Sequence, residues 1–184
     1  MIELTTERLL LRPWRDEDRA AFARMNTNAE VLRYFPRPYS AAESDRFVDA
    51  QNRSLRQHHR GNWALERLDT GAFIGFTGLS EPASWHPCAG SIEIGWRLAR
   101  EHWGGGLATE AAERVLQQAF ATLALPAVVS FTSRDNAPSI AVMRKLGLYD
   151  DGRGFEHPRI DVGHPLRPHV VYRLSRADWL ERQP

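Results

Sequence analysis

The stretch that decides the fold is Ile92–Ala112, which reads IEIGWRLAREHWGGGLATEAA. The part up to Leu98 predicts a strand, Gly104–Gly106 predict a turn, and helical spacing of apolar residues follows. Glycine permits positive φ and lets a ligand approach the backbone, and a helix start offers unpaired N–H groups with partial positive charge. The stretch therefore predicts either a site for a phosphate or pyrophosphate, or a structural turn that only caps a helix.

Two familiar nucleotide-binding patterns do not fit this turn. Thr109 stands where the dinucleotide pattern G-x-G-x-x-G needs its third glycine. No Gly-Lys-Ser/Thr follows, so the turn is not a P-loop either. These departures make a nucleotide-binding function the weaker interpretation.

A second strand-to-helix junction lies at Ser133–Leu148, which reads SRDNAPSIAVMRKLGL. Asn136 is a good N-cap, and proline is tolerated in the first helical turn, where its missing N–H costs nothing. Ser139 lies near the same helix start. The segment predicts polar side chains presented at a helix start, although an ordinary capped helix has the same pattern.

The rest of the chain alternates strands and helices without repeats or linkers, so we expect one domain over 1–184. The patterns predict strands over 7–14, 62–68, 72–79, 91–98, 127–132, 148–156 and 169–174, and helices over 15–25, 40–58, 106–123, 136–146 and 175–180. Consecutive strands without helices between them exclude a purely parallel sheet. We therefore predict an α/β chain with a mixed sheet and helices on its faces.

Composition narrows the function classes. The chain has 184 residues, of which 42% are hydrophobic and 26% charged, as in globular proteins. The formal net charge of +1 gives no field that would attract nucleic acid or a membrane surface. Cys88 is the single cysteine, no secretory signal is recognised, and no run approaches the roughly 18 apolar residues of a membrane span. We expect a cytoplasmic protein without nucleic-acid or membrane partners.

The two junctions together resemble the GNAT acetyltransferase superfamily. The family's pyrophosphate loop, Q/R-x-x-G-x-G/A, falls on Trp103–Ala108, with Gly106 and Ala108 at its two small positions and Trp103 departing from its Gln or Arg. The family's second motif falls on Asn136, Ser139 and Lys145–Leu148. The opening TERLLLRPW, the late VYRLSRADW and the aromatic residue before the glycines are similar to the subgroup of ribosomal-protein N-terminal acetyltransferases (RimJ/RimL-like).

The resemblance implies a fold and a cofactor. The fold is a mixed, mostly antiparallel sheet whose two central strands splay apart, and the cofactor is acetyl-CoA, with no metal. Its pantetheine arm would lie against the backbone of Trp96, Arg97 and Leu98 on one side and Asn136 and Ser139 on the other. Its pyrophosphate would lie on the loop and first helical turn, which comprise Trp103, Gly104, Gly105, Gly106, Leu107, Ala108 and Thr109.

The resemblance also implies direct acetyl transfer to an amine. Many members use a tyrosine of the second helix as the proposed acid, but Met143 stands there and cannot donate a proton. Ser139 is the remaining candidate acid, and it could equally serve only to bind the cofactor. Glu93 is the candidate base, since alternation along the strand places it on one face with Gly95 and Arg97. A solvent-facing or ion-paired glutamate is the alternative for Glu93.

The acceptor is left open by the sequence. A protein N-terminal α-amine and a small-molecule amine both fit, and the segment 153–169, dense in His, Arg and Pro, is a candidate acceptor loop. His157 and His164 have no metal-ligand spacing. A catalytically inactive acyl-CoA-binding regulatory module is the alternative function, which the methionine at 143 favours and Ser139 opposes. We expect a monomer or a homodimer.

Overall fold

The strands join into one mixed sheet in the computed structural model, which describes residues 2–182. Along the sheet the order is β1-β2-β3-β4-β5-β6-β9-β7, and β8 also pairs with β9. The strands are β1 (Leu4–Thr5), β2 (Leu9–Arg12), β3 (Asn62–Arg67), β4 (Phe73–Ser80), β5 (Glu93–Leu98), β6 (Ala127–Ser133), β7 (Tyr149–Asp150), β8 (Phe155–Glu156) and β9 (Pro168–Ser175). All pairings are antiparallel except that of β5 with β6, which confirms the predicted mixed, mostly antiparallel sheet.

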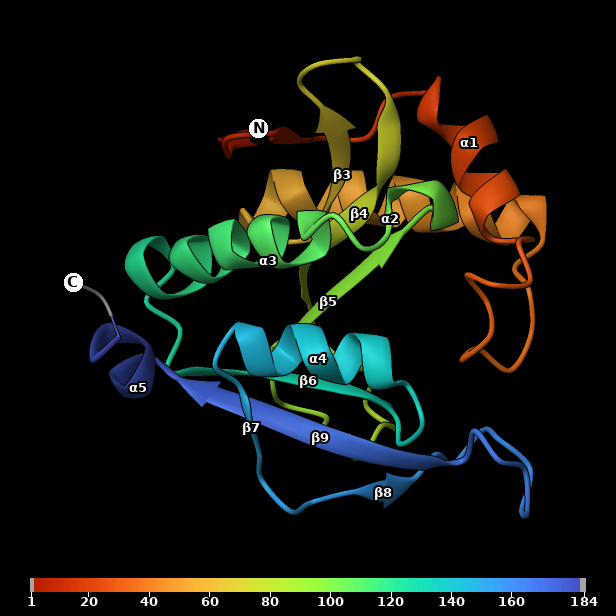
Figure 1. Ribbon diagram of the computed structural model, residues 1–184, viewed down its shortest axis with the longest axis vertical. Helices are drawn as coiled ribbons and strands as arrows, with labels where there is room; N and C mark the ends of the chain where they lie inside the picture. Colours follow the sequence, from red (N-terminus) through yellow and green to blue (C-terminus); the bar gives the residue numbers. More distant parts are fainter. Residues whose placement is uncertain (1, 183–184) are drawn as a thin grey trace.

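The two central strands diverge. β5 and β6 share a single register pair, Glu93 with Val129, and the amide of Val129 donates to the carbonyl of Ile92 at 2.8 Å. Beyond this point the strands part, as Figure 1 shows below helix α3. On their outer edges β5 is paired along its length with β4, and β6 with β9. The predicted splay is thus confirmed, and it leaves a wedge between two firmly paired halves of the sheet.

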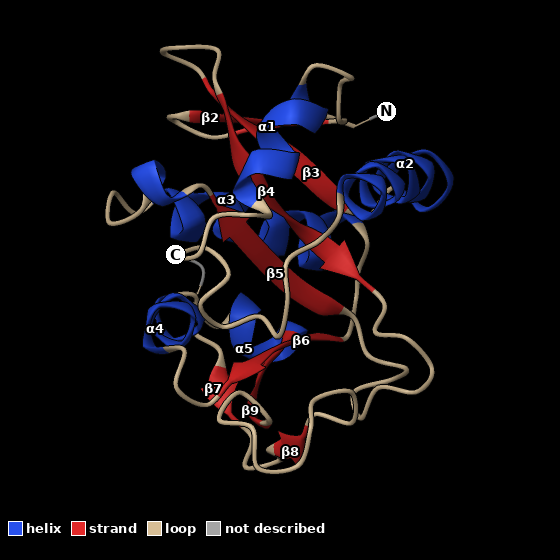
Figure 2. Ribbon diagram, turned by 90° about the vertical axis from the view of Figure 1, so that its right-hand side faces the viewer, coloured by secondary structure: helices blue, strands red, loops and turns tan. Residues whose placement is uncertain are grey.

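Helices cover both faces of the sheet. They are α1 (Asp18–Met25), α2 (Ala41–His58), α3 (Leu107–Gln117), α4 (Ala137–Lys145) and α5 (Arg176–Leu180), with a 3₁₀ turn at Arg100–His102 and a π-helical turn at Gln118–Thr122. Figure 2 shows α2 on one side of the sheet and α3 and α4 on the other. Within the described residues, no helix combines the length and apolarity needed to cross a lipid bilayer.

Most of the predicted elements agree with the structure, and two differ. The capping box at Ser40 and Glu43 is present, with both reciprocal hydrogen bonds formed. In α2 the buried face runs through Ser44, Val48 and Leu55, whereas Ala50 is exposed. The strand expected over 148–156 is two short strands, β7 and β8, since a turn containing Gly152 with φ +73° separates them. The helix after the glycines changes to π-helical hydrogen bonding over its last turn.

Two hydrophobic clusters hold the helices to opposite faces. Leu65 and Ile74 belong to the cluster under α3, whereas Ala64 and Phe76 belong to the cluster with α1 and α2. Ile74 and Phe76 reach opposite faces although they are two residues apart, because the β3–β4 register shifts beside them in a β-bulge. Directly opposite residues project on the same face. The β5 residues that stand opposite Phe76, Gly78 and Ser80 therefore face α1 and α2.

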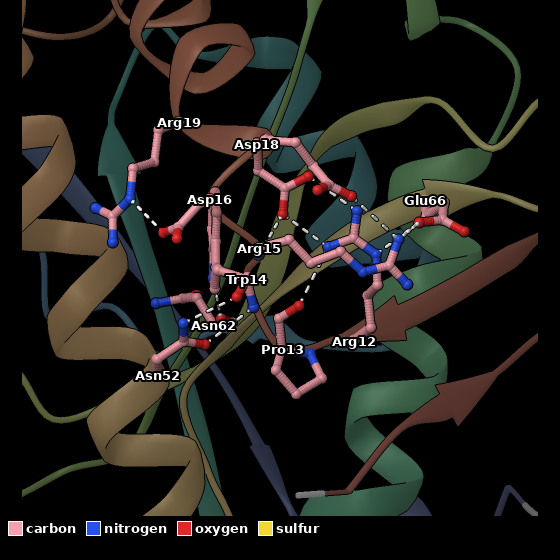
Figure 3. A network of polar contacts seen from close by, with 11 residues as sticks. Arg12, Pro13, Trp14, Arg15, Asp16, Asp18, Arg19, Asn52, Asn62 and Glu66 are labelled. Carbon is pink, nitrogen blue, oxygen red and sulfur yellow. Dashed lines mark hydrogen bonds and ion pairs between the residues drawn. The ribbon is translucent and has the colours of Figure 1, made fainter.

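A buried ion-pair network connects the end of β2 to the start of α1 (Figure 3). The Arg12 guanidinium donates to both carboxylate oxygens of Asp18, at 2.7 and 2.9 Å, and its Nε donates to Glu66 of β3 at 2.6 Å. Both Arg12 and Asp18 side chains are only 2% exposed. The network joins β2, α1 and β3, and so fixes the start of α1 against the sheet.

We predict that Asp18→Ala lowers the free energy of unfolding by about 3–5 kcal/mol, because it leaves the buried Arg12 cation without its bidentate partner. Urea unfolding would measure this. Asp16→Ala is the matched control, since Asp16 pairs with Arg19 at an exposed site and its loss should cost about 1 kcal/mol or less. Equal losses in both variants would contradict a structural role for the buried pair.

Candidate active site

A cavity of about 600 Å³ occupies the wedge between β5 and β6. Its walls come from β5, the glycine turn, the starts of α3 and α4, the segment between α1 and α2, and the loop before β9. Among the predicted site residues, those that line it are Glu93, Trp96, Arg97, Leu98, Trp103, Gly104, Gly106, Leu107, Ala108, Thr109, Asn136 and Ser139. Of the predicted catalytic and cofactor-binding residues, only Gly105 does not line the cavity. Two distant sequence segments therefore meet at one cavity.

The glycine turn has the form of an anion site. Gly104 and Gly106 have φ of +80° and +81°, which L side chains rarely adopt. A Cβ placed on Gly104 or Gly105 would meet no heavy atom within 4 Å, so the backbone there is open to a ligand. Gly106 is the N-cap of α3, and no side chain of the described residues caps this helix start. Its first N–H groups thus remain available to an anion.

Arg8 brings a positive charge to this turn, and our sequence reasoning missed it. Its Nη1 donates to the carbonyl of Gly105 at 2.9 Å, and its guanidinium pairs with Glu110 of α3 at 2.6 Å. Its Nη2 lies 3.6 Å from the position of a Cβ on Gly106. The arginine lies 97 residues before the turn it contacts, so only a structure reveals the contact.

The backbone N–H and C=O groups of successive β5 residues point alternately toward β4 and toward the wedge. The amide of Ala99 donates to Ile74 of the β4 side, and the carbonyl of Ile92 accepts from β6. Ladder alternation then directs the backbone of Ile94, Trp96 and Leu98 toward the wedge and that of Arg97 toward β4. The Leu98 carbonyl already accepts from the Trp103 indole at 2.8 Å. Trp96 is therefore the residue whose backbone groups face the open wedge, and Arg97 reaches the cavity through its side chain.

The start of α4 forms the opposite wall. The Asn136 side chain caps the helix by accepting from the Ser139 amide at 3.3 Å, and it donates to Thr132 at 2.8 Å. The Ser139 hydroxyl lines the cavity, and no hydrogen bond of this hydroxyl is found within the described residues. Met143 also lines the cavity but is only 1% exposed. Ser139 is thus the hydroxyl that this helix offers to a ligand.

Glu93 is a carboxyl group in a desolvated position. Burial raises the pKa of Glu93 to about 7, and a hydrogen bond from the Ser80 hydroxyl at 3.0 Å works against this shift. Its Oε1 would lie 3.5 Å from a Cβ on Gly95, so the carboxylate folds along β5 over a residue that has no side chain. A group with this pKa can accept a proton near neutral pH.

Some aromatic residues and histidines line the cavity, and others lie away from it. Tyr34, Phe35, His157 and His169 line the cavity. Trp14 and Trp63 lie in the hydrophobic core, and Trp85 is 41% exposed. Burial lowers the pKa of both His157 and His169, so their rings are neutral at pH 7.

The remaining members of the predicted acceptor loop lie outside the cavity. Arg153 pairs with Asp151, and Arg167 pairs with Glu156. Asp161 and His164 are exposed. The described part of the chain contains no group of three or more His, Cys, Asp or Glu side chains placed to hold a metal ion. Of this loop, His157, Ile160 and His169 line the cavity.

Comparisons with known proteins identify the family and the fold. Residues 8–149 match the family model described as an acetyltransferase (GNAT) domain. The uncharacterized N-acetyltransferase YoaA of Bacillus subtilis is 32% identical over 81% of this chain and 84% of its own length. A GNAT-family acetyltransferase from Bacillus anthracis has the same fold, with a TM-score of 0.79 over 96% of this chain and 99% of that one, at 22% identity.

Two further similar proteins carry the names of their acceptors. Spermidine N(1)-acetyltransferase of Escherichia coli is 29% identical over 77% of this chain and 73% of its own length. The ribosomal-protein-S5-alanine acetyltransferase of Vibrio fischeri shares the fold at 16% identity, with a TM-score of 0.76 over the full length of both chains. The family match, the relatives and the fold lead to one conclusion: this chain is a member of the GNAT family of N-acetyltransferases.

Proposed function

We propose that the enzyme transfers the acetyl group of acetyl-CoA directly to a primary amine, which is either a protein N-terminal α-amine or the amine of a small molecule. The observation that carries this proposal is a carboxyl group with a pKa near 7 in a wedge that ends at an uncapped helix start. The motifs at both ends of the chain support the RimJ/RimL-like subgroup, and the V. fischeri neighbour shares the fold.

The residues present fit acetyl-CoA. The open glycine backbone, the uncapped start of α3 and the Arg8 guanidinium provide for the pyrophosphate, through the amides of Gly106–Thr109. Trp96 offers backbone groups to the amides of the pantetheine arm, and Asn136 and Ser139 lie opposite. When bound, the cofactor supplies a thioester carbonyl that an amine can attack.

Glu93 would act as the general base. It removes a proton from the ammonium form of the acceptor, directly or through a water molecule, and so delivers a neutral amine. An α-amine, with a pKa of roughly 7.7–8.0, needs little help, whereas a lysine, near 10.4, needs much more. Ser139 would donate a proton to the sulfur that leaves. Because Glu93 and Ser139 both line the cavity, an active enzyme is the better interpretation than an inactive binding module, although Met143 cannot donate a proton.

The cofactor site is tested by Gly106→Glu. We expect this variant to weaken acetyl-CoA binding at least 100-fold in calorimetric titration, because it places bulk and negative charge at the pyrophosphate site. Gly106→Ala is the matched control, since it imposes the same backbone strain at φ +81° without the charge, and should weaken binding much less. A wild-type protein that binds neither acetyl-CoA nor CoA would overturn the proposal.

The role of Glu93 is tested by the pH dependence of kcat/KM. A base with a pKa of about 7 is active when deprotonated, so the wild-type rate should rise through pH 7 and then level off. Glu93→Gln should lower the rate about 10²- to 10⁴-fold and remove this rise. A variant that keeps both the rate and the rise would exclude Glu93 as the base.

The same pKa predicts a change in stability. The pKa of Glu93 is 4.5 in the unfolded chain and about 7 in the folded one, so the folded protein binds the proton more tightly. This preference contributes fully to the free energy of unfolding below pH 4.5, and the contribution is lost as the pH rises through 7. Glu93→Gln does not titrate, so above pH 7 it should be more stable relative to wild type than it is at pH 4.5, by up to about 3 kcal/mol. Urea unfolding of both proteins at several pH values measures this difference.

Ser139→Ala separates proton donation from cofactor binding. If Ser139 is the acid, kcat should fall at least about tenfold while the dissociation constant for acetyl-CoA stays within about twofold. Calorimetry and steady-state kinetics on the same preparation provide both values. Weaker acetyl-CoA binding with unchanged kcat would assign the hydroxyl to the cofactor alone.

A further inference from the structure

Arg97 is a buried cation without a carboxylate partner. The residue is 9% exposed and lines the cavity. Its Nη1 donates to the Asn26 amide oxygen at 2.7 Å, but its Nε is buried and has no hydrogen-bond partner. No Asp or Glu of the described residues forms an ion pair with it, in contrast to the buried Arg12. Buried polar groups in proteins normally have a hydrogen-bond partner, so we look for the missing partner of Arg97 in a bound ligand.

Aromatic rings hold the guanidinium in place but do not neutralise it. Its carbon lies 4.0 Å from the ring centroid of Phe35, 5.3 Å from that of Tyr39 and 5.6 Å from that of Phe76. Burial lowers the pKa of Arg97, while Tyr39 opposes this shift. The charge is therefore oriented and desolvated, and a desolvated guanidinium binds carboxylate strongly.

The side chain lies on the face of the sheet away from the pyrophosphate site. Arg97 stands opposite Phe76 in the β4–β5 register, and Phe76 belongs to the cluster with α1 and α2. Glu93 stands opposite Ser80 on the same face. The neighbouring Ile94 and Leu98 belong to the cluster under α3, whose N-terminus is the candidate pyrophosphate site. Arg97 thus shares its face with the candidate base, which is the acceptor's side of the wedge.

The charged residues that line the cavity also favour an acceptor with a negative group. Glu93 is the only carboxyl group among the described residues that line it, and its raised pKa leaves it partly protonated at pH 7. Arg97 and Lys145 are the cationic lining residues. A polyamine would bring several positive charges to this wall, where they would be repelled. The cavity is therefore better suited to an acceptor with a negative group.

We propose that the acceptor is an amino carboxylate, an amine whose own carboxylate binds the Arg97 guanidinium while its amine faces Glu93. This inference rests on the proposed acetyl transfer and narrows its acceptor class. Since Glu93 extends over Gly95, and Gly95 and Arg97 are separated by about 7 Å along the strand, the amine and the carboxylate are expected to be a few bonds apart.

The experiment compares matched acceptors with wild-type enzyme and acetyl-CoA. Glycine, β-alanine and phenylalanine are each assayed beside their own amides, with rates corrected for the fraction of neutral amine, and spermidine is included. We expect at least one of these carboxylates to exceed its amide in kcat/KM at least tenfold. Arg97→Gln should lower kcat/KM for that carboxylate about 10- to 100-fold and leave the amide unchanged. Arg97→Lys should keep part of the preference for the carboxylate over its amide.

The controls separate this inference from the proposed function. Arg56→Gln removes an exposed charge of α2 that does not line the cavity. It should leave kcat/KM unchanged for both the carboxylate and its amide. Acetyl-CoA affinity, measured by calorimetry, should be the same in wild type and Arg97→Gln. If amides or spermidine are acetylated as well as or better than every carboxylate, or if Arg97→Gln slows carboxylate and amide equally, the inference is overturned while acetyl transfer stands.

If the enzyme acetylates none of these acceptors, a binding measurement tests the inference. The N-acetyl product of each amino carboxylate is titrated into the enzyme–CoA complex, beside the corresponding N-acetyl amide. Tighter binding of the carboxylate product, lost in Arg97→Gln and partly kept in Arg97→Lys, supports the inference. Equal binding of the two products, or binding of neither, overturns it. Should Arg97→Gln fail to fold, the wild-type comparison and Arg97→Lys give the same decision.

Discussion

The single backbone pairing between β5 and β6 is the constraint on which the rest of the site depends. Because Glu93 and Val129 form the only register pair, the two strands meet at one end and separate toward the other. β4 and β9 hold them on their outer edges, so the separation does not loosen the sheet. The open inner edge leaves the backbone of Trp96 facing the cavity, and the helices that follow each strand begin beside it.

Alternation along β5 then gives the wedge two chemically different faces. One face joins the hydrophobic core under α3 and leads to the uncapped helix start and Arg8, which suit an anion. The other carries Glu93 and Arg97 toward α1 and α2, with Gly95 between them. The β-bulge beside Ile74 keeps Phe76 on this second face, where it packs against Arg97. A cofactor and an acceptor can thus approach the same strand from opposite sides.

The sequence predicts what depends on local signals. The capping box at Ser40, the cap at Asn136 and the glycine turn each leave a short pattern, and alternation alone places Glu93 with Arg97. Long-range contacts leave no such signal. The contact of Arg8 with the glycine turn and the enclosure of Arg97 by Phe35 and Tyr39 join segments dozens of residues apart. The exposure of Ala50 likewise reflects which face of α2 meets the sheet, and its neighbours in sequence do not determine this.

The central claim is that the wedge between β5 and β6 holds the cofactor and divides its site from that of the acceptor. A crystal structure of the complex with acetyl-CoA tests it most directly. We predict the pyrophosphate on the amides of Gly106–Thr109, the pantetheine arm along the backbone of Trp96, and the thioester on the side of Glu93 and Arg97. Density for the cofactor outside the wedge, or a thioester that ends on the α3 side of β5, would contradict the account.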